Sequence, residues 1–234
     1  MKKTAISIAL AGAALGFAST NASAALATDA LLSMGPQSET CPYGLGTPPD
    51  CVAGDPIPQS NYFAMDTDGD GIHQEDERTA ISAGSDGGVL LGVAQNAHTG
   101  QIDAPWVFFG PVGEHATDVG PTILSDDGAG NATLDFSGWR VFWNNTNINM
   151  GSGGTSNGVA TLTCGTDCGL GDSFVLDYDA TVPDDGSTNF GNVYYAFHIE
   201  GTISEVAAIP VPAAVWLFGS GLLGLVGVAR RKKA

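Results

Sequence analysis

Two stretches of alternating sequence identify the fold: SFVLDYDATV at residues 173–182 and VYYAFHIEGTI at residues 193–203. Apolar and polar side chains alternate in both, so one face of an extended strand would be buried and the other would meet solvent. Val159 to Cys164 alternates in the same way. Because Gly, Asp and Asn separate these runs, the pattern predicts neighbouring strands joined by turns.

Further short apolar runs on the N-terminal side indicate more strands, near residues 89–93, 106–109 and 135–143. Strands without intervening helical patterns favour packed antiparallel sheets. We therefore predict an all-β fold, an antiparallel, jelly-roll-like β-sandwich over residues 61–205, with a barrel as the alternative. Residues 25–60 are rich in Pro, Gly and Ser, and are predicted to form an irregular segment before this domain.

The basic residues are concentrated at the two ends of the chain. The sequence has 8 Lys and Arg against 25 Asp and Glu, for a formal net charge of −17. Only Arg78 and Arg140 lie between the ends, so the middle of the chain carries 2 − 25 = −23. Such an acidic body repels phosphate backbones, which argues against nucleic-acid binding. The charge fits two other roles equally, solubility in a saline habitat and cation-bridged contact with anionic polysaccharide.

Residues 1–24 have the organisation of a secretory signal peptide. Lys2 and Lys3 precede an apolar segment from Ala5 to Phe17, and Ala22-Ser23-Ala24 has the A-x-A form of a signal-peptidase site. We expect a signal helix here, with cleavage by signal peptidase after Ala24. Export would place the body in an oxidising compartment.

Residues 206–234 have the organisation of a membrane anchor. Two prolines lie within the short motif Pro210, Val211, Pro212 and Ala213, and an apolar run follows that ends at Arg230-Arg231-Lys232-Lys233. Residues 213–229 can form a short transmembrane helix, and the basic cluster would hold the C-terminus in the cytoplasm. The body would then lie in the periplasm at the inner membrane.

The run IPVPAAVWLFGSGLLGLVGVARRKKA, residues 209–234, resembles the PEP-CTERM sorting signal in its VPLPA-like variant. Val211 stands where the Glu of a Pro-Glu-Pro motif would be, which leaves the cleavage position open. The resemblance implies an exosortase-like protease that cuts near the prolines, and release or attachment at the surface of a Gram-negative bacterium that makes exopolysaccharide. An ordinary permanent tail anchor is the alternative.

Residues 66–77, DTDGDGIHQEDE, fit the D-x-[DN]-x-[DN]-G-x5-E pattern of EF-hand calcium loops. In such a loop alternate carboxylates converge on one cation, a glycine makes the sharp turn, and a final Glu supplies two oxygens. The predicted ligands are the side chains of Asp66, Asp68, Asp70 and Glu77 and the carbonyl oxygen of Ile72. Oxygen ligands alone favour Ca²⁺ over zinc or copper, and the role expected of the ion is structural.

The loop departs from a paired EF-hand, since no second hand is present and no helical pattern precedes it. It resembles the single DxDxDG loops of thrombospondin type 3 and dockerin-like repeats. A short helix after Asp76, through Ile81, would be compatible with that resemblance. The alternative is a solvated acidic turn.

Four cysteines in an exported chain indicate two disulfides, with three possible connectivities. We expect local pairing, Cys41 with Cys51 and Cys164 with Cys168. The alternative of a metal site lacks the C-x2-C spacing.

The sequence contains no H-E-x-x-H motif and its histidines are scattered, so they do not indicate a catalytic set. Trp106, Trp139 and Trp143 lie inside apolar runs, which favours core packing. We expect a non-enzymatic surface or matrix protein associated with exopolysaccharide. Two alternatives stay open: a carbohydrate-binding module with exposed Trp or Tyr side chains on one sheet face, and a hydrolase with two carboxyls roughly 5 to 9 Å apart in a deep cleft.

Overall fold

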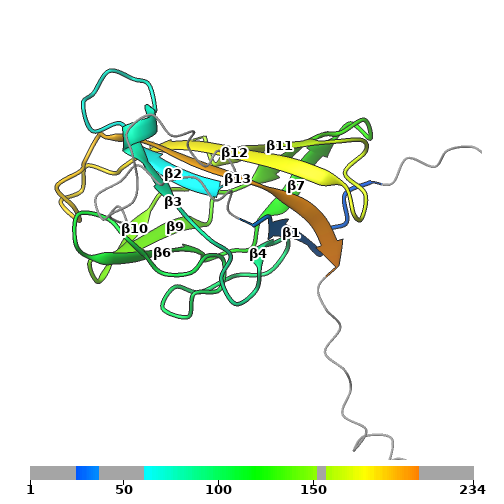
Figure 1. The fold of residues 1–234 in the computed structure, drawn as a ribbon, viewed down its shortest axis with the longest axis horizontal. Helices are drawn as coiled ribbons and strands as arrows, with labels where there is room; N and C mark the ends of the chain where they lie inside the picture. The colour runs from blue at the N-terminus through cyan, green and yellow to red at the C-terminus, as the bar shows by residue number, and fades with distance from the viewer. Residues whose placement is uncertain (1–24, 37–60, 152–156, 206–234) are drawn as a thin grey trace, which may run out of the picture.

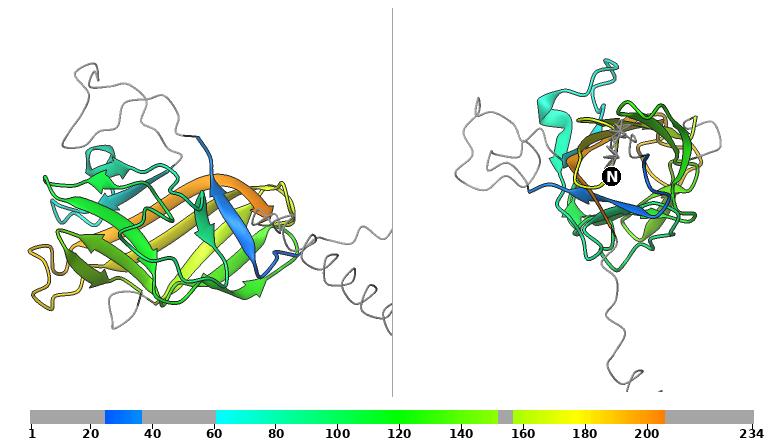
Figure 2. Two further views of the ribbon diagram at one scale, coloured as in Figure 1. Left: turned by 90° about the horizontal axis from the view of Figure 1, so that it is seen from below. Right: turned by 90° about the vertical axis from the view of Figure 1, so that its right-hand side faces the viewer.

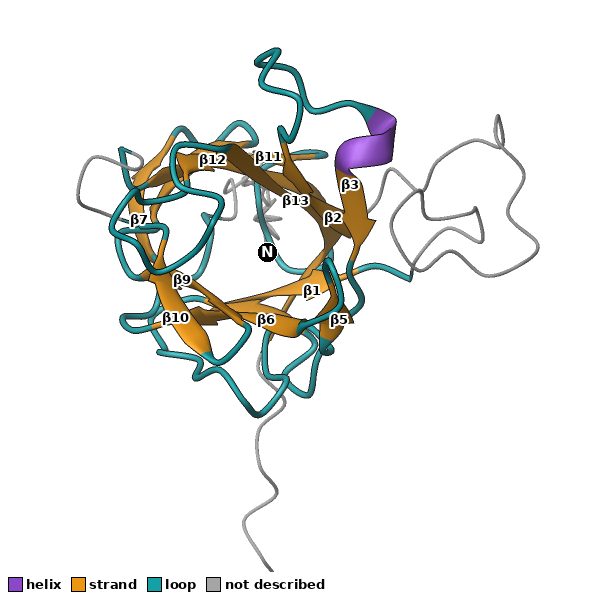
Figure 3. Cartoon of the chain, turned by 90° about the vertical axis from the view of Figure 1, so that its left-hand side faces the viewer, coloured by secondary structure: helices purple, strands orange, loops and turns teal. Residues whose placement is uncertain are grey.

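The computed structural model describes residues 25–36, 61–151 and 157–205. These residues form two antiparallel sheets that enclose one core (Figures 1 and 3). The prediction of an all-β fold is confirmed, and the arrangement is consistent with a β-sandwich; its jelly-roll topology stays a prediction. The expected signal helix, the cysteines at 41 and 51, the sorting motif at 210–213 and the expected transmembrane helix lie outside the described residues.

The larger sheet has nine strands, of which seven follow in the order β3-β2-β13-β12-β11-β8-β7. They are β1 (Ala30–Met34), β2 (Asn61–Met65), β3 (Arg78–Ala80), β4 (Gly88–Leu90), β7 (Thr122–Asp126), β8 (Asn131–Asp135), β11 (Val159–Cys164), β12 (Ser173–Thr181) and β13 (Tyr194–Glu205). The alternating stretches form its centre, where β12 and β13 pair from Ser173 opposite Thr202 to Thr181 opposite Tyr194. Alternation thus predicted these two strands because each buries one face.

The smaller sheet has four strands in the order β10-β9-β6-β5. They are β5 (Trp106–Val107), β6 (Val112–Thr117), β9 (Trp139–Trp143) and β10 (Thr146–Asn149). The run expected at 106–109 ends as a strand at Val107, because residues 108–111 turn back into β6. Phe109 and Gly110 in that turn have φ angles of 49° and 102°.

Strand β1 corrects the prediction that residues 25–60 are irregular. β13 is twelve residues long, and β2 covers only Tyr195 to Ile199 of it. β1 pairs with the next stretch, from Gly201 to Glu205, and pairs with β4 on its other side. The domain therefore includes residues well before position 61. The part of β13 that β2 leaves unpaired forms its hydrogen bonds with β1 instead, and the composition of residues 25–60 did not indicate this strand.

Asn61 joins β1 and β2 where they meet beside β13. Its side chain is fully buried, its Nδ2 donates to the carbonyl oxygen of Gly35 (3.0 Å), and its Oδ1 accepts from the N–H of Glu200 (2.9 Å). A buried amide bonded in this way satisfies backbone groups that neither strand reaches. Gly35, after which the chain leaves the sheet, therefore lies beside Asn61, where the chain re-enters it.

The core lies between the two sheets and is rich in aromatic side chains. Tyr178 of β12 and Phe197 of β13 pack on Trp139 of the smaller sheet, with ring centroids 6.3 and 4.6 Å away. Trp106 and Trp139 are buried, as expected, whereas Trp143 is half-buried at the edge of the core.

The two ends of the sandwich carry different features (Figures 1 and 2). We define the terminal end by Leu26, the turn at residues 126–131, the disulfide loop at residues 164–172 and the last residues of β13. We define the distal end by the loop at residues 66–77, the turn at residues 108–111 and the loop at residues 183–193. In the described ranges no helix is long and apolar enough to cross a membrane.

Candidate metal site

The loop at residues 66–77 connects β2 to β3 at the distal end (Figure 1). The N–H of Asp66 donates to the carbonyl oxygen of Tyr194 at the start of β13 (2.9 Å). A 3-10 turn, η1 (Glu75–Glu77), leads into β3. The short helix expected through Ile81 does not form, because residues 78–80 extend to pair with β2. Both ends of the loop are therefore attached to the larger sheet.

Three of the predicted ligands lie together. One carboxylate oxygen from each of Asp66, Asp68 and Asp70 lies within 4.8 Å of the other two. Asp66 is buried, at 6% exposure, while Asp68 and Asp70 face solvent. Carboxylates at this separation repel one another, and one metal ion between them can compensate that repulsion.

Backbone N–H groups hold the Asp66 carboxylate in place. Its Oδ1 accepts from Gly69 (2.7 Å) and Asp70 (3.1 Å), and its Oδ2 accepts from Gly71 (2.8 Å). Gly69 and Gly71 have φ angles of 77° and 82°, which glycine adopts without strain. Burial acts to raise the pKa of Asp66, but these hydrogen bonds hold that pKa below its usual value. Asp66 is therefore the charged anchor of the cluster.

The pKa of Asp68 is shifted in the opposite direction. A hydrogen bond from the N–H of Asp70 acts to lower it, but desolvation and the charges of Asp70, Glu77 and Asp66 raise it above its usual value. Part of the raised pKa comes from repulsion between neighbouring carboxylates, and a bound cation would relieve that part.

The other two predicted ligands belong to the loop but not to this cluster. The carboxylate of Glu77 accepts hydrogen bonds from the N–H groups of Thr67 and Gln74. Ile72 is 63% exposed, and its N–H donates to Oδ1 of Asp70 (2.8 Å). Metal ligation by Glu77 and by the Ile72 carbonyl stays a prediction.

Gln74 is a loop residue that the sequence pattern missed. Its Nε2 donates to Oδ2 of Asp70 (2.8 Å) and approaches Oδ2 of Asp68 (3.4 Å). It occupies the ninth position counted from Asp66, where EF-hand loops provide a ligand, often through water. The pattern treats this position as variable, although counting along the loop would have identified it.

A polar groove of about 370 Å³ lies on the outer face of the larger sheet, beside the loop. Its lining includes Val159, Thr161, Asp177, Asp179, Thr181 and Tyr194. Tyr194 connects the groove to the loop, because the ring of His73 stacks on it with centroids 4.5 Å apart. A ligand in this groove would therefore lie next to the loop that carries the acidic cluster.

Beside the groove, His198 has a carboxylate partner, which the sequence could not reveal. Its Nδ1 lies 2.6 Å from Oδ1 of Asp177. Burial acts to lower the pKa of His198, but Asp177 and Glu200 raise it above its usual value. The pair lies on the outer face, where it shapes the charge of the groove.

His115 forms a second pair, within the core. Its Nδ1 lies 2.5 Å from Oδ2 of Asp103, and its Nε2 lies 2.8 Å from the hydroxyl of Tyr195. Trp106 Nε1 donates to the same Asp103 oxygen (2.9 Å). The side chains of His115 and Asp103 have no solvent exposure, so these bonds join the two sheets rather than face a substrate.

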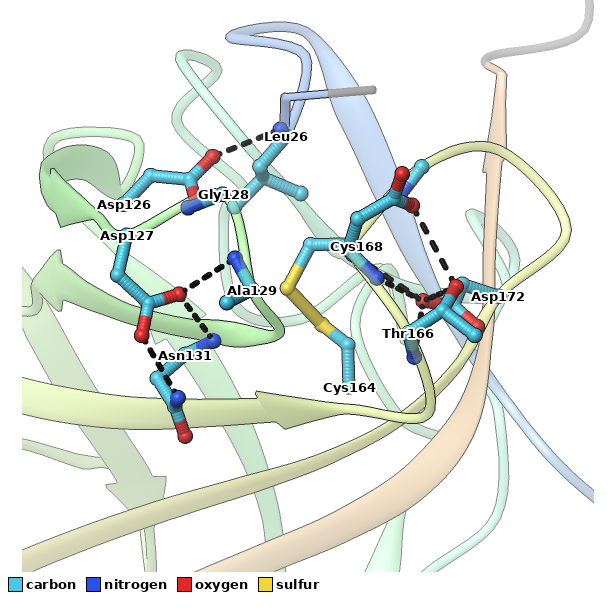
Figure 4. The surroundings of a disulfide bond; sticks show 12 residues. Leu26, Asp126, Asp127, Gly128, Ala129, Asn131, Cys164, Thr166, Cys168 and Asp172 are labelled. Carbon is cyan, nitrogen blue, oxygen red and sulfur yellow. Dashed lines mark hydrogen bonds between the residues drawn. A yellow bond between two sulfur atoms is a disulfide. The ribbon is translucent and has the colours of Figure 1, made fainter. Parts of the chain in front are cut away.

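The disulfide between Cys164 and Cys168 forms as predicted, at the terminal end. Asp172 organises its loop, because Oδ2 accepts from the N–H groups of Thr166 (2.9 Å), Asp167 (3.0 Å) and Cys168 (3.1 Å) (Figure 4). Burial acts to raise the pKa of Asp172, but these hydrogen bonds lower it.

Comparisons of the chain with protein-family models, curated proteins and solved structures found no match.

Proposed function

We propose that the chain is an exported, non-enzymatic cell-surface or extracellular-matrix protein with a structural Ca²⁺ ion at its distal end. The observation that carries the proposal is the cluster of Asp66, Asp68 and Asp70, whose carboxylates lie within reach of one ion. Only oxygen donors are gathered there, which suits a hard cation. Ile72 and Glu77 would complete the ligand set, and the bound ion would hold the loop rigid against the larger sheet.

The pairing of β1 with β13 supports a precursor held at the inner membrane. Ala30 lies opposite Glu205, so the chain enters and leaves the sandwich at the terminal end (Figure 1). A signal peptide before β1 and a sorting segment after β13 would then reach one membrane from the same end. The distal end, with its metal loop, would face away from that membrane, and an exosortase-like protease would later cut near residues 210–213.

Thermal melting tests the calcium site. Full-length protein in detergent is melted with excess Ca²⁺ and with chelator, and Ca²⁺ should raise the melting temperature. At a free concentration of about 100 Kd the ion would add about 2.7 kcal/mol of stability. Asp68→Asn should lose this response, whereas Asp127→Asn, in a turn at the terminal end, should keep it. Equal melting of the wild-type protein in both conditions would contradict the proposal.

Intact-mass analysis of the protein recovered from membrane, culture and supernatant fractions tests the proposed cleavage by an exosortase-like protease. A mature species that lacks everything beyond about residue 213 supports processing by an exosortase-like protease. A full tail confined to the membrane fraction supports the permanent anchor instead.

The groove on the outer face favours carbohydrate binding as a second candidate function. Its carboxylates and threonine hydroxyls can bond to sugar hydroxyls, and the Tyr194 ring offers a surface for a sugar face. The groove lies on an open sheet face, whereas a hydrolase needs a deep cleft, so it favours binding over hydrolysis. Its acidic lining favours neutral over anionic chains.

Affinity electrophoresis in gels that contain a neutral glucan or an anionic alginate tests this candidate. The glucan should retard the wild-type protein, and Tyr194→Ala should abolish the retardation. Tyr62→Ala, outside the groove, should not. Equal mobility of wild type and Tyr194→Ala in the glucan gel would contradict the role of the groove.

A further inference from the structure

The residues that follow the predicted signal peptide are built into the terminal end. Leu26 is 4% exposed and belongs to the hydrophobic core. Its N–H donates to Oδ2 of Asp126 (2.9 Å), as Figure 4 shows. A turn closed by the N–H of Ala30 on the carbonyl oxygen of Ala27 (3.1 Å) then leads into β1. The fold thus begins no later than Leu26.

This boundary distinguishes two possible processing sites. The A-x-A form occurs at Ala22-Ser23-Ala24 and again at Ala25-Leu26-Ala27. Cleavage after Ala27 would remove Leu26, with its core contacts and its bond to Asp126. Cleavage after Ala24 keeps both, so the folded domain favours the earlier site.

The turn that receives Leu26 is rich in carboxylate. Oδ1 of Asp126 accepts from the N–H of Gly128 (2.8 Å), which leaves Oδ2 directed at Leu26 (Figure 4). The neighbouring Asp127 accepts hydrogen bonds from the side chain and the N–H of Asn131 and from the N–H of Ala129, which lower its pKa. The turn therefore places two carboxylates side by side.

Within the described residues the arginine side chains lie elsewhere. Arg140 pairs with Asp118, and Arg78 lies over the ring of Tyr62, 4.4 Å from its centroid. No lysine occurs between Lys3 and Lys232. Neither of these two arginines is therefore an ion-pair partner of the turn.

We infer that signal peptidase cleaves between Ala24 and Ala25, and that the Asp126 carboxylate binds the ammonium group released on Ala25. Hydrolysis adds one water across the peptide bond, so Ala24 leaves with a carboxylate and Ala25 keeps the amine, which takes up a proton. Consecutive Cα atoms are about 3.8 Å apart, so this ammonium lies one residue from an N–H already bonded to Asp126. One such residue step added to the 2.9 Å hydrogen bond keeps the ammonium within about 7 Å of Oδ2 of Asp126, inside the screening length of about 8 Å at physiological salt. The inference rests on the proposed export.

The first experiment maps the N-terminus. The full chain is expressed in a bacterium with signal peptidase, and the N-terminal peptide of the membrane-fraction protein is sequenced by mass spectrometry. The peptide should begin at Ala25. A start at Thr28 would overturn the inference and leave export intact, whereas an uncut chain would overturn the proposed export together with the inference.

The second experiment measures the basicity of the new amine, from the pH dependence of its acylation in the processed protein. Its pKa should lie above the usual value of about 8, and Asp126→Asn should return it to that value. Asp185→Asn is the matched control, because Asp185 forms the same turn with the N–H of Ser187 (2.8 Å) at the distal end.

The same pKa in wild type and in Asp126→Asn would overturn the ion pair without affecting export. If Asp126→Asn folds poorly, a wild-type titration at high salt replaces it. Salt should lower the amine pKa by screening, and a salt-independent pKa at about 8 would overturn the inference.

Discussion

The terminal and distal ends of the sandwich both carry acidic loops, but their charges are compensated differently. At the terminal end, Asp127 and Asp172 accept several hydrogen bonds each and have lowered pKa values, and a disulfide crosses the neighbouring loop. At the distal end, Asp68 and Asp70 lie beside buried Asp66, and the pKa of Asp68 is raised. Hydrogen bonds within the protein compensate the charges at the terminal end, whereas the cluster at the distal end could also hold a metal ion.

The largest difference between the ends should come from apolar truncation. Leu26→Ala in the processed protein should cost about 3 kcal/mol of unfolding free energy, because it leaves a cavity in the core. Phe109→Ala at the distal end should cost below about 1 kcal/mol, since that side chain is already 50% exposed. Urea unfolding measures the loss of unfolding free energy in each variant. Equal losses in Leu26→Ala and Phe109→Ala would contradict the expected difference between the two ends.

Loss of the disulfide should be the next largest effect. Replacing Cys164 and Cys168 by Ser frees a loop with a sequence separation of 4, which corresponds to about 2 kcal/mol of chain entropy. Urea unfolding should show this loss equally with Ca²⁺ and with chelator, because the metal loop is at the other end. A changed calcium response would show that the ends are coupled.

A fixed positive charge should partly replace the distal cation. Gln74→Lys places an ammonium where the amide now bonds to Asp70 and Asp68, so the chelated protein should gain stability, by less than about 1 kcal/mol. Its melting temperature should also respond less to Ca²⁺ than that of the wild type. Asn189→Lys adds the same charge at the distal end away from the cluster, and should keep the full response.

The smallest effect should come from acid. In chelated protein, lowering the pH should change the contributions of the two ends to the free energy of unfolding in opposite directions. Asp172 has a lowered folded pKa, so its contribution is present above the unfolded value of about 3.9 and is lost as pH falls through the folded value. Asp68 has a raised folded pKa, so its contribution is present below about 3.9 and is lost as pH rises through the folded value.

Urea unfolding between about pH 2 and pH 6 checks the signs against Asp172→Asn and Asp68→Asn. The advantage of the wild type over Asp172→Asn should shrink on acidification. The disadvantage of the wild type relative to Asp68→Asn should also shrink. If the free energy of unfolding changed with pH in the same way in the wild type and in both variants, the directions given for the Asp172 and Asp68 pKa shifts would be contradicted.

Local pattern was sufficient wherever a feature depends on residues close in sequence. Alternation predicted β11, β12 and β13, the D-x-D-x-D-G spacing predicted the Asp66, Asp68 and Asp70 cluster, and a separation of four predicted the Cys164–Cys168 bond. Each is a short-range geometric consequence of the chain, because strand pleat, turn and loop closure act over a few residues.

The remaining features join residues far apart in sequence, and only the folded chain brings them together. β1 belongs to the sheet because β13 is longer than β2. His115 forms hydrogen bonds with Asp103 and Tyr195 because the two sheets face each other. Leu26 donates to Asp126, which is one hundred positions away in the sequence. Sequence alone determined the strand-forming runs, the acidic loop and the disulfide. Tertiary structure decided the partners, because a hydrogen bond between distant residues depends on how sheets pack, which no local pattern encodes.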